Sequence, residues 1–145
     1  MAVVQVKGVN VTKIEAGTGG DNWIPQGLVK SSIKVFSDTY VSLGSETHVS
    51  TIQLAVLPVG SIVWAVYLAF PDVGSATSTL DIGDAVDVDR YAAAIDTTAA
   101  GTYFGTLIAG AQHQVIATTT DIIATINTAA WDTAGTLKFA VFYTN

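Results

Sequence analysis

The residues best suited to chemistry lie in the segment 81–91, DIGDAVDVDRY. Four of the chain's twelve acidic side chains fall within nine positions there, namely Asp81, Asp84, Asp87 and Asp89. Several carboxylates and carbonyl oxygens in one loop can hold a calcium ion, but the EF-hand glycine and closing glutamate are absent. We expect a connecting loop in which the aspartates accept local N–H groups and Arg90 pairs with one of them. Calcium binding is the alternative.

Other catalytic candidates are sparse in this sequence. The two histidines, His48 and His113, both fall in predicted strands, and only a pairing of those strands would bring them together at a metal. No serine lies in a Gly-x-Ser-x-Gly elbow. The glycine-rich run at 17–21, GTGGD, lacks the following lysine and helix of a phosphate-binding loop. We predict no enzymatic activity, no cofactor, and solvent-facing histidines.

The three tryptophans, Trp23, Trp64 and Trp131, are scattered along the chain. Tryptophans in a β-rich protein can form a platform for a sugar ring, although more often they pack in the core or at an interface. Trp131 falls in an apparent loop, so it is the one expected to be exposed. It is therefore the candidate residue for contact with a glycan.

The composition of this chain limits the classes of partner that it can bind. Its 145 residues suit one compact core, and half of them are hydrophobic while only 12% are charged. The formal net charge of -6 has the wrong sign for a surface that neutralises phosphates, so nucleic acid is not expected as a partner. Without cysteine the chain forms no disulfide and no thiolate metal site.

A long uncharged stretch between Glu46 and Asp72 approaches the length of a membrane span. Its centre, LAVLPVGSIVWAVYLAF, is interrupted by the turn sequence at 58–60, and both halves are rich in β-branched residues. Acidic rather than basic residues flank it. Two buried strands are therefore predicted, with no membrane partner. The N-terminal sequence has no secretory signal pattern, so synthesis in a cytoplasm is expected.

Period-two hydrophobic patterns dominate and helix signals are nearly absent, which predicts an all-β fold. The expected strands are 3–11, 29–36, 38–43, 47–56, 60–70, 78–82, 90–95, 112–117, 122–126 and 135–143. Turn clusters about 8 to 12 residues apart favour an antiparallel β-sandwich, jelly-roll-like, with an extended N-terminal segment. Residues 1–24 are expected to form an arm or a first strand, and residues 25–145 the sandwich domain.

The last strand shows the clearest alternation of this kind. Leu137, Phe139, Val141 and Tyr143 are predicted to face one side, and Lys138, Ala140, Phe142 and Thr144 the other. In the strand at 60–70 both faces are apolar. Ile62, Trp64, Val66, Leu68 and Phe70 are expected on one face, and Val63, Ala65, Tyr67 and Ala69 on the other. Such a strand is covered on both sides, by a second sheet and by another sheet or subunit.

Three segments carry a resemblance to small virion proteins of tailed bacteriophages. They are LPVGSIVWAVYLAF, LDIGDAVDVDRYAAAIDTTAAGTYF and TDIIATINTAAWDTAGTLKFAVFYTN. The elements that resemble the family are the turn at 57–60, residues 82–84 and 89–91, the strand at 120–125 and the final strand at 135–143. The resemblance covers about residues 50 to 145 and carries no catalytic residues.

The resemblance implies a capsid decoration, or cement, protein. Proteins of this type are β-sandwich or jelly-roll modules that bind the outside of the head, often as homotrimers, and stabilise capsomer junctions by non-covalent contacts. The implied partners are copies of the chain itself and the major capsid protein, and the implied location is the capsid exterior of the virion. The alternative is a receptor-binding or glycan-binding module of a tail fibre or head fibre.

Apolar side chains are the candidates for these contacts. For self-association we select residues of the doubly apolar strand and one from the last strand, namely Trp64, Tyr67, Phe70 and Phe142. For contact with the shell we select the N-terminal segment, with Val4, Val6, Val9, Val11 and Trp23.

Overall fold

The computed structural model describes residues 33–106 and 114–145, and within these ranges the ordered elements are all β-strands. The predicted strand at 3–11 lies outside the described residues, as does His113. The strands are β1 (Lys34–Leu43), β2 (Thr51–Leu57), β3 (Ile62–Phe70), β4 (Thr79–Gly83), β5 (Ala92–Asp96), β6 (Gly101–Thr106), β7 (Thr120–Asn127) and β8 (Ala134–Thr144).

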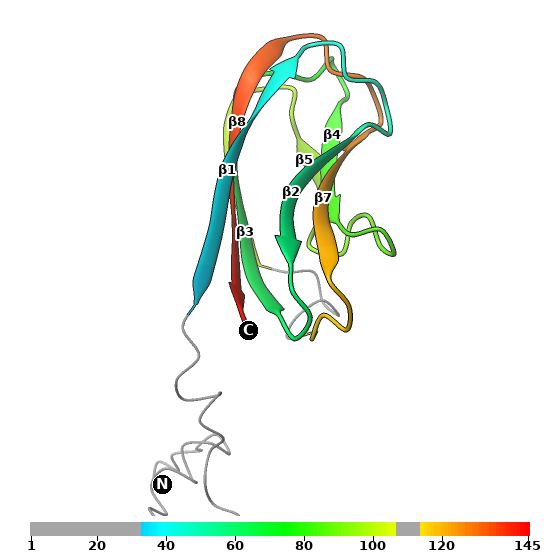
Figure 1. Cartoon of the computed structure of the whole chain (residues 1–145). Coiled ribbons are helices and arrows are strands. Elements are labelled where there is room, and N and C mark those ends of the chain that lie inside the picture. Colours follow the sequence, from blue (N-terminus) through cyan, green and yellow to red (C-terminus); the bar gives the residue numbers. More distant parts are fainter. Residues whose placement is uncertain (1–32, 107–113) are drawn as a thin grey trace, which may run out of the picture. The chain divides into compact units, whose positions relative to one another are not determined.

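Eight strands form two antiparallel four-stranded sheets packed face to face (Figure 1). Sheet A has the order β1-β8-β3-β6 and sheet B the order β2-β7-β4-β5. Every strand pairing is antiparallel, and apart from β4 and β5 each successive strand lies in the other sheet. The predicted antiparallel β-sandwich is therefore confirmed. Eight strands in two sheets with this order are compatible with a jelly roll.

The core lies between the sheets and follows from the alternation of side chains along each strand. In β8, Leu137, Phe139 and Val141 are buried, as predicted, because this face meets sheet B. From the opposite sheet, Ile122 and Ile126 of β7 are fully buried. Burying one such aliphatic side chain contributes about 1.5 to 3 kcal/mol, so this interior provides most of the driving force for folding.

The uncharged stretch predicted to form two strands does so. β2 and β3 lie in different sheets and are joined at Pro58–Gly60, where Gly60 has a φ of 87°, a conformation that side chains other than glycine rarely adopt. The Gly60 N–H donates to the Ile116 carbonyl at 2.8 Å and fixes the turn. In the described part of the chain, no helix is both long and apolar enough to cross a membrane.

A β-bulge in β3 changes the predicted faces of that strand. Val63 pairs with Tyr143 and Ala65 pairs with Phe142, so Trp64 is the extra residue of the bulge. Beyond the bulge, Val66, Leu68 and Phe70 point into the core as expected. Trp64, however, does not share their face, and the prediction that it does is wrong.

Other differences concern strand boundaries. The predicted strands 29–36 and 38–43 meet in one long strand, β1, within the described residues. β6 was not expected, because its sequence GTYFGT has two glycines and no clear apolar alternation. Residues 114–117 form an isolated bridge, Ile62 with Val115, in place of the predicted strand at 112–117.

Candidate interaction surface

The outer face of sheet A carries a group of apolar side chains, which we call the aromatic face. Its members are Val35 of β1, Trp64 and Tyr67 of β3, Phe104 of β6 and Phe142 of β8. The strand register places them together, because Val35 is opposite Phe142, Phe142 is opposite Ala65, and Tyr67 is opposite Phe104. Four strands thus contribute to one surface.

Aromatic rings on this face contact one another and remain open to solvent. The Phe104 ring lies 5.8 Å from that of Phe142 in an edge-to-face arrangement and 6.5 Å from that of Tyr67, both centroid distances. These separations are those of favourable aromatic pairs. Phe104 is nevertheless 66% exposed, Val35 is 53% exposed, and Tyr67 and Phe142 are half-buried. Contiguous exposed apolar surface of this kind is typical of an interaction site.

Trp64 extends the aromatic face toward the end of β8. Its indole Nε1 donates to the hydroxyl of Thr144 at 3.0 Å, which holds the ring over the outer side of the strand. In this position Trp64 is 41% exposed, while Thr144 beneath its ring is buried. The bulge therefore has a consequence for function, since it moves a large aromatic side chain from the core side to the outer side of the sheet.

Two of the candidate residues prove to be core residues. Phe70 is only 8% exposed and belongs to the hydrophobic core of the subunit, so it is not available for self-association. Trp131 is 2% exposed, and the expectation that it is an exposed loop residue is wrong. The loop folds inward there because Trp131 pairs with Gly74 in an isolated bridge. In addition, the backbone N–H of Trp131 donates to the Glu46 carbonyl at 2.9 Å. A buried ring cannot stack on a sugar.

The outer face of sheet B is polar. The strand register places on it mostly hydroxyl, amide and carboxylate side chains, namely Thr51, Gln53, Thr79, Asp81, Asp96, Asp121, Thr125 and Asn127, with Val56 and Ile123 among them. Asp81 is buried, and its two carboxylate oxygens accept from the Ala94 N–H at 2.7 Å and the Asn127 amide at 2.8 Å. Ala94 has a φ of 54°, so the carboxylate stabilises an unusual backbone conformation.

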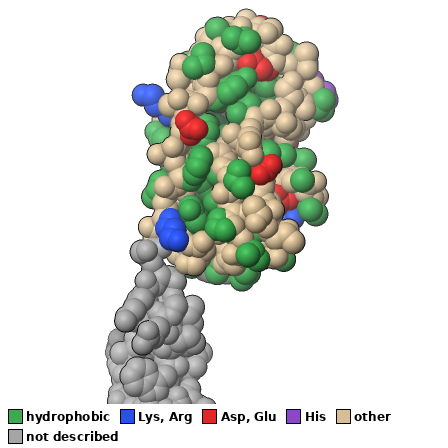
Figure 2. Space-filling model, in the orientation of Figure 1, with side chains coloured by type: hydrophobic (Ala, Val, Ile, Leu, Met, Phe, Trp, Pro, Cys, Tyr) green, Lys and Arg blue, Asp and Glu red, His purple; other side chains and the backbone are tan. Residues whose placement is uncertain are grey.

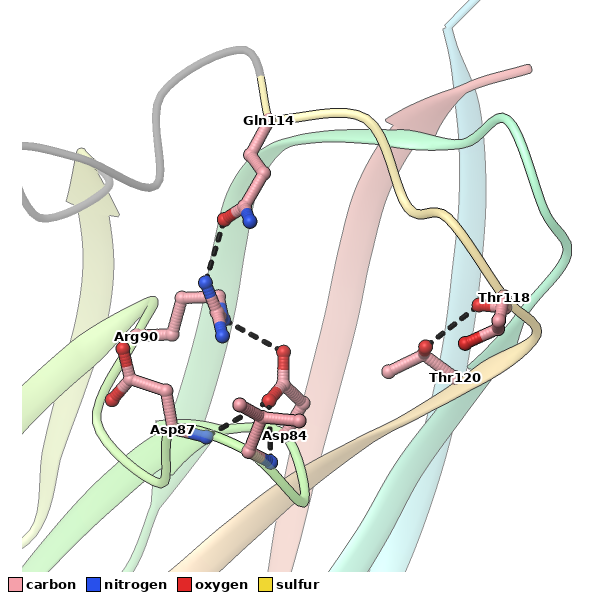
Figure 3. Close-up of polar contacts among 7 residues, drawn as sticks. Asp84, Asp87, Arg90, Gln114, Thr118 and Thr120 are labelled. Atoms are coloured by element: carbon pink, nitrogen blue, oxygen red, sulfur yellow. Dashed lines mark hydrogen bonds and ion pairs between the residues drawn. The ribbon is translucent and has the colours of Figure 1, made fainter.

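Rather than converging on one point, the acidic segment forms a braced loop (Figure 3). The Asp84 carboxylate accepts from the Val86 and Asp87 N–H groups at 2.9 and 3.0 Å and pairs with Arg90 Nε at 2.7 Å. Arg90 also donates to Gln114 at 2.6 Å. These contacts are the connecting loop and the Arg90 pairing expected from the sequence.

Calcium binding by this loop has no geometric support. Because Asp81 and Asp84 are committed to the donors described above, their oxygens do not face a common point with those of the other two aspartates. Among the residues that the structure describes, no group of three or more histidine or acidic side chains could hold a metal ion. A hydrogen bond with Asp87 raises the pKa of the exposed Asp89 carboxyl.

A second carboxylate cluster closes the connection from sheet A to sheet B. The Glu46 carboxylate accepts from the Tyr40 and Ser42 hydroxyls, both at 2.8 Å, and from the Leu43 N–H at 2.9 Å. Burial alone raises the pKa of Glu46, but these hydrogen bonds outweigh burial and lower the pKa to about 2. Sequence patterns did not indicate this cluster, because its donors are the N–H of the last residue of β1 and two strand hydroxyls.

The remaining candidates contribute little to the described surface. His48 is exposed and lies in the turn before β2, not in a strand as expected. The proposed shell-contact residues Val4, Val6, Val9, Val11 and Trp23 lie outside the described residues, so these predictions stay open.

Sequence reasoning missed Phe104 and Val35, because their strands pair with β3 and β8 only in the folded sheet. The two residues are exposed apolar side chains in polar stretches, which was the available signal.

Comparisons with known structures find similar chains in the capsids of three bacteriophages. No family model and no curated protein matches this chain. The structure is similar to a chain of the Cyanophage Pam1 capsid asymmetric unit, with a TM-score of 0.64 and 26% identity over 79% of this chain and 85% of that one. It also shares its fold with a chain of the capsid of Ralstonia phage GP4, with a TM-score of 0.56 and 18% identity over 77% of this chain and 84% of that one. A chain from the acid-stable capsid of Helicobacter pylori bacteriophage KHP30 has the same fold, with a TM-score of 0.50 and 14% identity over 79% and 94% of the two chains.

Proposed function

We propose that this protein is a non-enzymatic structural component of a bacteriophage virion, a decoration protein that binds the outside of the head and stabilises capsomer junctions. The observation that carries the proposal is the similarity to a chain of the cyanophage capsid, which spans most of both chains at 26% identity. The two further capsid chains with the same fold support it. The sequence resemblance to phage virion proteins agrees with this function.

The aromatic face provides a physical means of assembly. Phe104 at 66% and Trp64 at 41% exposure together leave roughly 200 Å² of aromatic surface in water, given 150–250 Å² for a whole aromatic side chain. Contact between copies of the chain removes this surface from water, and we propose a homotrimer as the product. Many copies that each add modest contacts then stabilise a shell by mass action and avidity.

The N-terminal segment is proposed to contact the major capsid protein. Its apolar residues at 3–11 and Trp23 are separate in sequence from the sandwich strands, so removing them leaves the described fold complete. Deletion of residues 1–24 is expected to abolish binding to heads while the purified protein stays folded. Full binding by the truncated chain would show that another part of the molecule makes the contact.

Copy number in the virion tests the proposed function most simply. A decoration protein is expected at a copy number comparable to that of the major capsid protein, as measured by quantitative mass spectrometry of purified particles. A handful of copies per particle would instead indicate a tail fibre or head fibre, and absence from particles would refute both. Binding of the purified chain to heads that lack it is the second readout, and heads saturated with the protein serve as the control.

A further inference from the structure

β1 is an exposed edge strand with features that suit pairing with another strand. It is the terminal strand of sheet A and has ten residues, and six consecutive positions from Lys34 to Thr39 are exposed. Natural proteins usually protect such an edge with charged side chains, proline, a bulge or a short strand. β1 has charged side chains only at Lys34 and Asp38, contains no proline and pairs with β8 in unbroken register from end to end. One row of backbone donors and acceptors on β1 therefore faces away from the sheet.

The side chains at the start of β1 form a short pattern that is complementary to itself. Lys34, Phe36 and Asp38 alternate along the strand and therefore lie on one face of it. Phe36 is 38% exposed although it is a large aromatic residue. A positive charge and a negative charge are thus placed symmetrically about an exposed aromatic ring. Figure 2 shows how few charged side chains interrupt the hydrophobic and uncharged surface on this side of the molecule.

We propose that β1 pairs antiparallel with β1 of a second copy of the chain about a two-fold axis at Phe36. In this register, Phe36 lies opposite Phe36 of the other copy, and each Lys34 lies opposite an Asp38. Oppositely charged residues in such cross-strand positions are stabilising, and like charges are destabilising. The two copies of sheet A become one continuous sheet, and the backbone groups on both edges gain partners.

Charge selects this register over its neighbours. Moving the axis by one residue, to Val35, places Lys34 opposite Phe36 and Asp38 opposite position 32, which precedes β1. Centring the pair on residue 34 or on residue 38 places two lysines or two aspartates directly opposite. The axis at Phe36 is the arrangement within β1 that satisfies both charges and also removes two aromatic rings from water.

This contact uses the edge of β1, whereas the aromatic face spans the outer side of sheet A, and the two share only Val35. It therefore joins subunits that belong to separate assemblies, which on a shell would link neighbouring decoration units across two-fold axes. That last step rests on the proposed function, whereas the pairing itself does not. A chain that decorates heads but shows no β1 pairing would contradict only this inference, and a chain that pairs through β1 but is absent from virions would contradict only the proposed function.

Disulfide trapping tests the register, because the natural chain has no cysteine. Phe36→Cys in the full chain places two thiols opposite each other, at a Cβ separation near that of a disulfide. Mild oxidation is expected to give a covalent dimer on a non-reducing denaturing gel. Val41→Cys is the matched control, since it is 62% exposed on the same strand but lies far from its own copy in this register. Equal dimer yield from the two variants, or no dimer from Phe36→Cys, would overturn the proposal.

Charge exchange tests the same contact independently of distance. Added to Phe36→Cys, Lys34→Glu is expected to lower the rate of dimer formation about tenfold, because both cross-strand pairs become repulsive. Combining Lys34→Asp with Asp38→Lys restores opposite charges and is expected to restore the rate. If the combined exchange is as slow as Lys34→Glu, the charges do not meet and the register is wrong. Circular dichroism of each variant confirms that the sandwich remains folded.

Discussion

The outer faces of the two sheets differ in how far their side chains find hydrogen-bond partners and apolar contacts within the subunit. On sheet B, Asp81 is buried and accepts from two donors of its own subunit, and the face around it consists largely of polar groups. On sheet A, Phe104 and Trp64 remain 66% and 41% exposed even after contacting their neighbours. The buried carboxylate of the polar face is therefore satisfied within one subunit, while the aromatic face leaves apolar area that only another molecule can cover. The alternation of side chains along the strands does not distinguish the polar face from the aromatic face, since each sheet has one buried side and one outer side.

This difference separates residues that stabilise the fold from residues that serve assembly. A change to a hydrogen-bonded side chain of the sheet B face, such as Asp81, is expected to alter the free energy of unfolding of the subunit. A change on the aromatic face is expected to alter association and to leave the subunit folded. The predictions below test this division from the largest expected effect to the smallest.

Phe104→Asp is expected to have the largest effect, a loss of self-association. A charge at position 104, on the edge strand β6 of this face, would be buried without a partner in the interface, so association is expected to weaken by about 4 kcal/mol, or about a thousandfold. The free energy of unfolding is expected to change by less than about 1 kcal/mol, because Phe104 is mostly exposed in the subunit. Sedimentation velocity over a concentration series measures the first quantity and denaturant unfolding the second. Unchanged association would place the interface elsewhere.

Asp81→Ala is expected to show the opposite behaviour. The substitution leaves the Ala94 N–H and the Asn127 amide without an acceptor, so the free energy of unfolding is expected to fall by about 2 to 3 kcal/mol. Association of the folded subunits should not change. Urea unfolding and sedimentation of the same samples provide both values. A fold as stable as the wild type would mean that the carboxylate is not needed to hold the backbone at Ala94.

Glu46→Gln is expected to have a smaller effect with a defined dependence on pH. The folded-state pKa of about 2 is below the ordinary value of 4.5, so the carboxylate stabilises the fold above pH 4.5, and this contribution is lost as pH falls toward 2. At pH 7 the variant is expected to be about 1 to 2 kcal/mol less stable than the wild type. This difference in stability between the variant and the wild type is expected to disappear in acid. Melting temperatures of both proteins at pH 7 and pH 2.5 measure it, and a gap that does not depend on pH would contradict the assignment.

Val56→Asp is expected to have the smallest effect and is the matched control for Phe104→Asp. Val56 is a 50% exposed apolar residue on the outer face of sheet B, so the substitution adds the same charge to the other sheet. Neither association nor stability is expected to change by more than about 0.5 kcal/mol. Sedimentation that shows dissociated subunits for this variant would remove the distinction between the two faces.

Much of the fold could be predicted from local patterns. One face of β8 carries Leu137, Phe139 and Val141, and this buried face is the one that the sequence indicates. The turn at Pro58–Gly60 has a strong local signal, so the division of a long apolar stretch into two strands was also predictable. β6 was missed because its stability comes from pairing with β3, while its own residues have weak strand character.

The candidate surface depended on information that no local pattern contains. Trp64 faces outward because the register between β3 and β8 shifts at that residue, and the register is set by pairing across the sheet. Trp131 lies in a loop with polar neighbours, yet it is buried because the loop bridges to Gly74. Only the topology places Phe104 beside Tyr67 and Phe142.

The most direct test of the central claim is the solvent accessibility of the aromatic face in the assembled particle. Hydroxyl-radical footprinting of the protein on virions and of the dissociated subunit compares the oxidation of Phe104 and Trp64 in the two states. We predict strong protection of both residues on the particle, with His48 in its exposed turn as the internal reference. Equal oxidation of Phe104 and Trp64 in the two states would show that this face stays in solvent and would contradict the account.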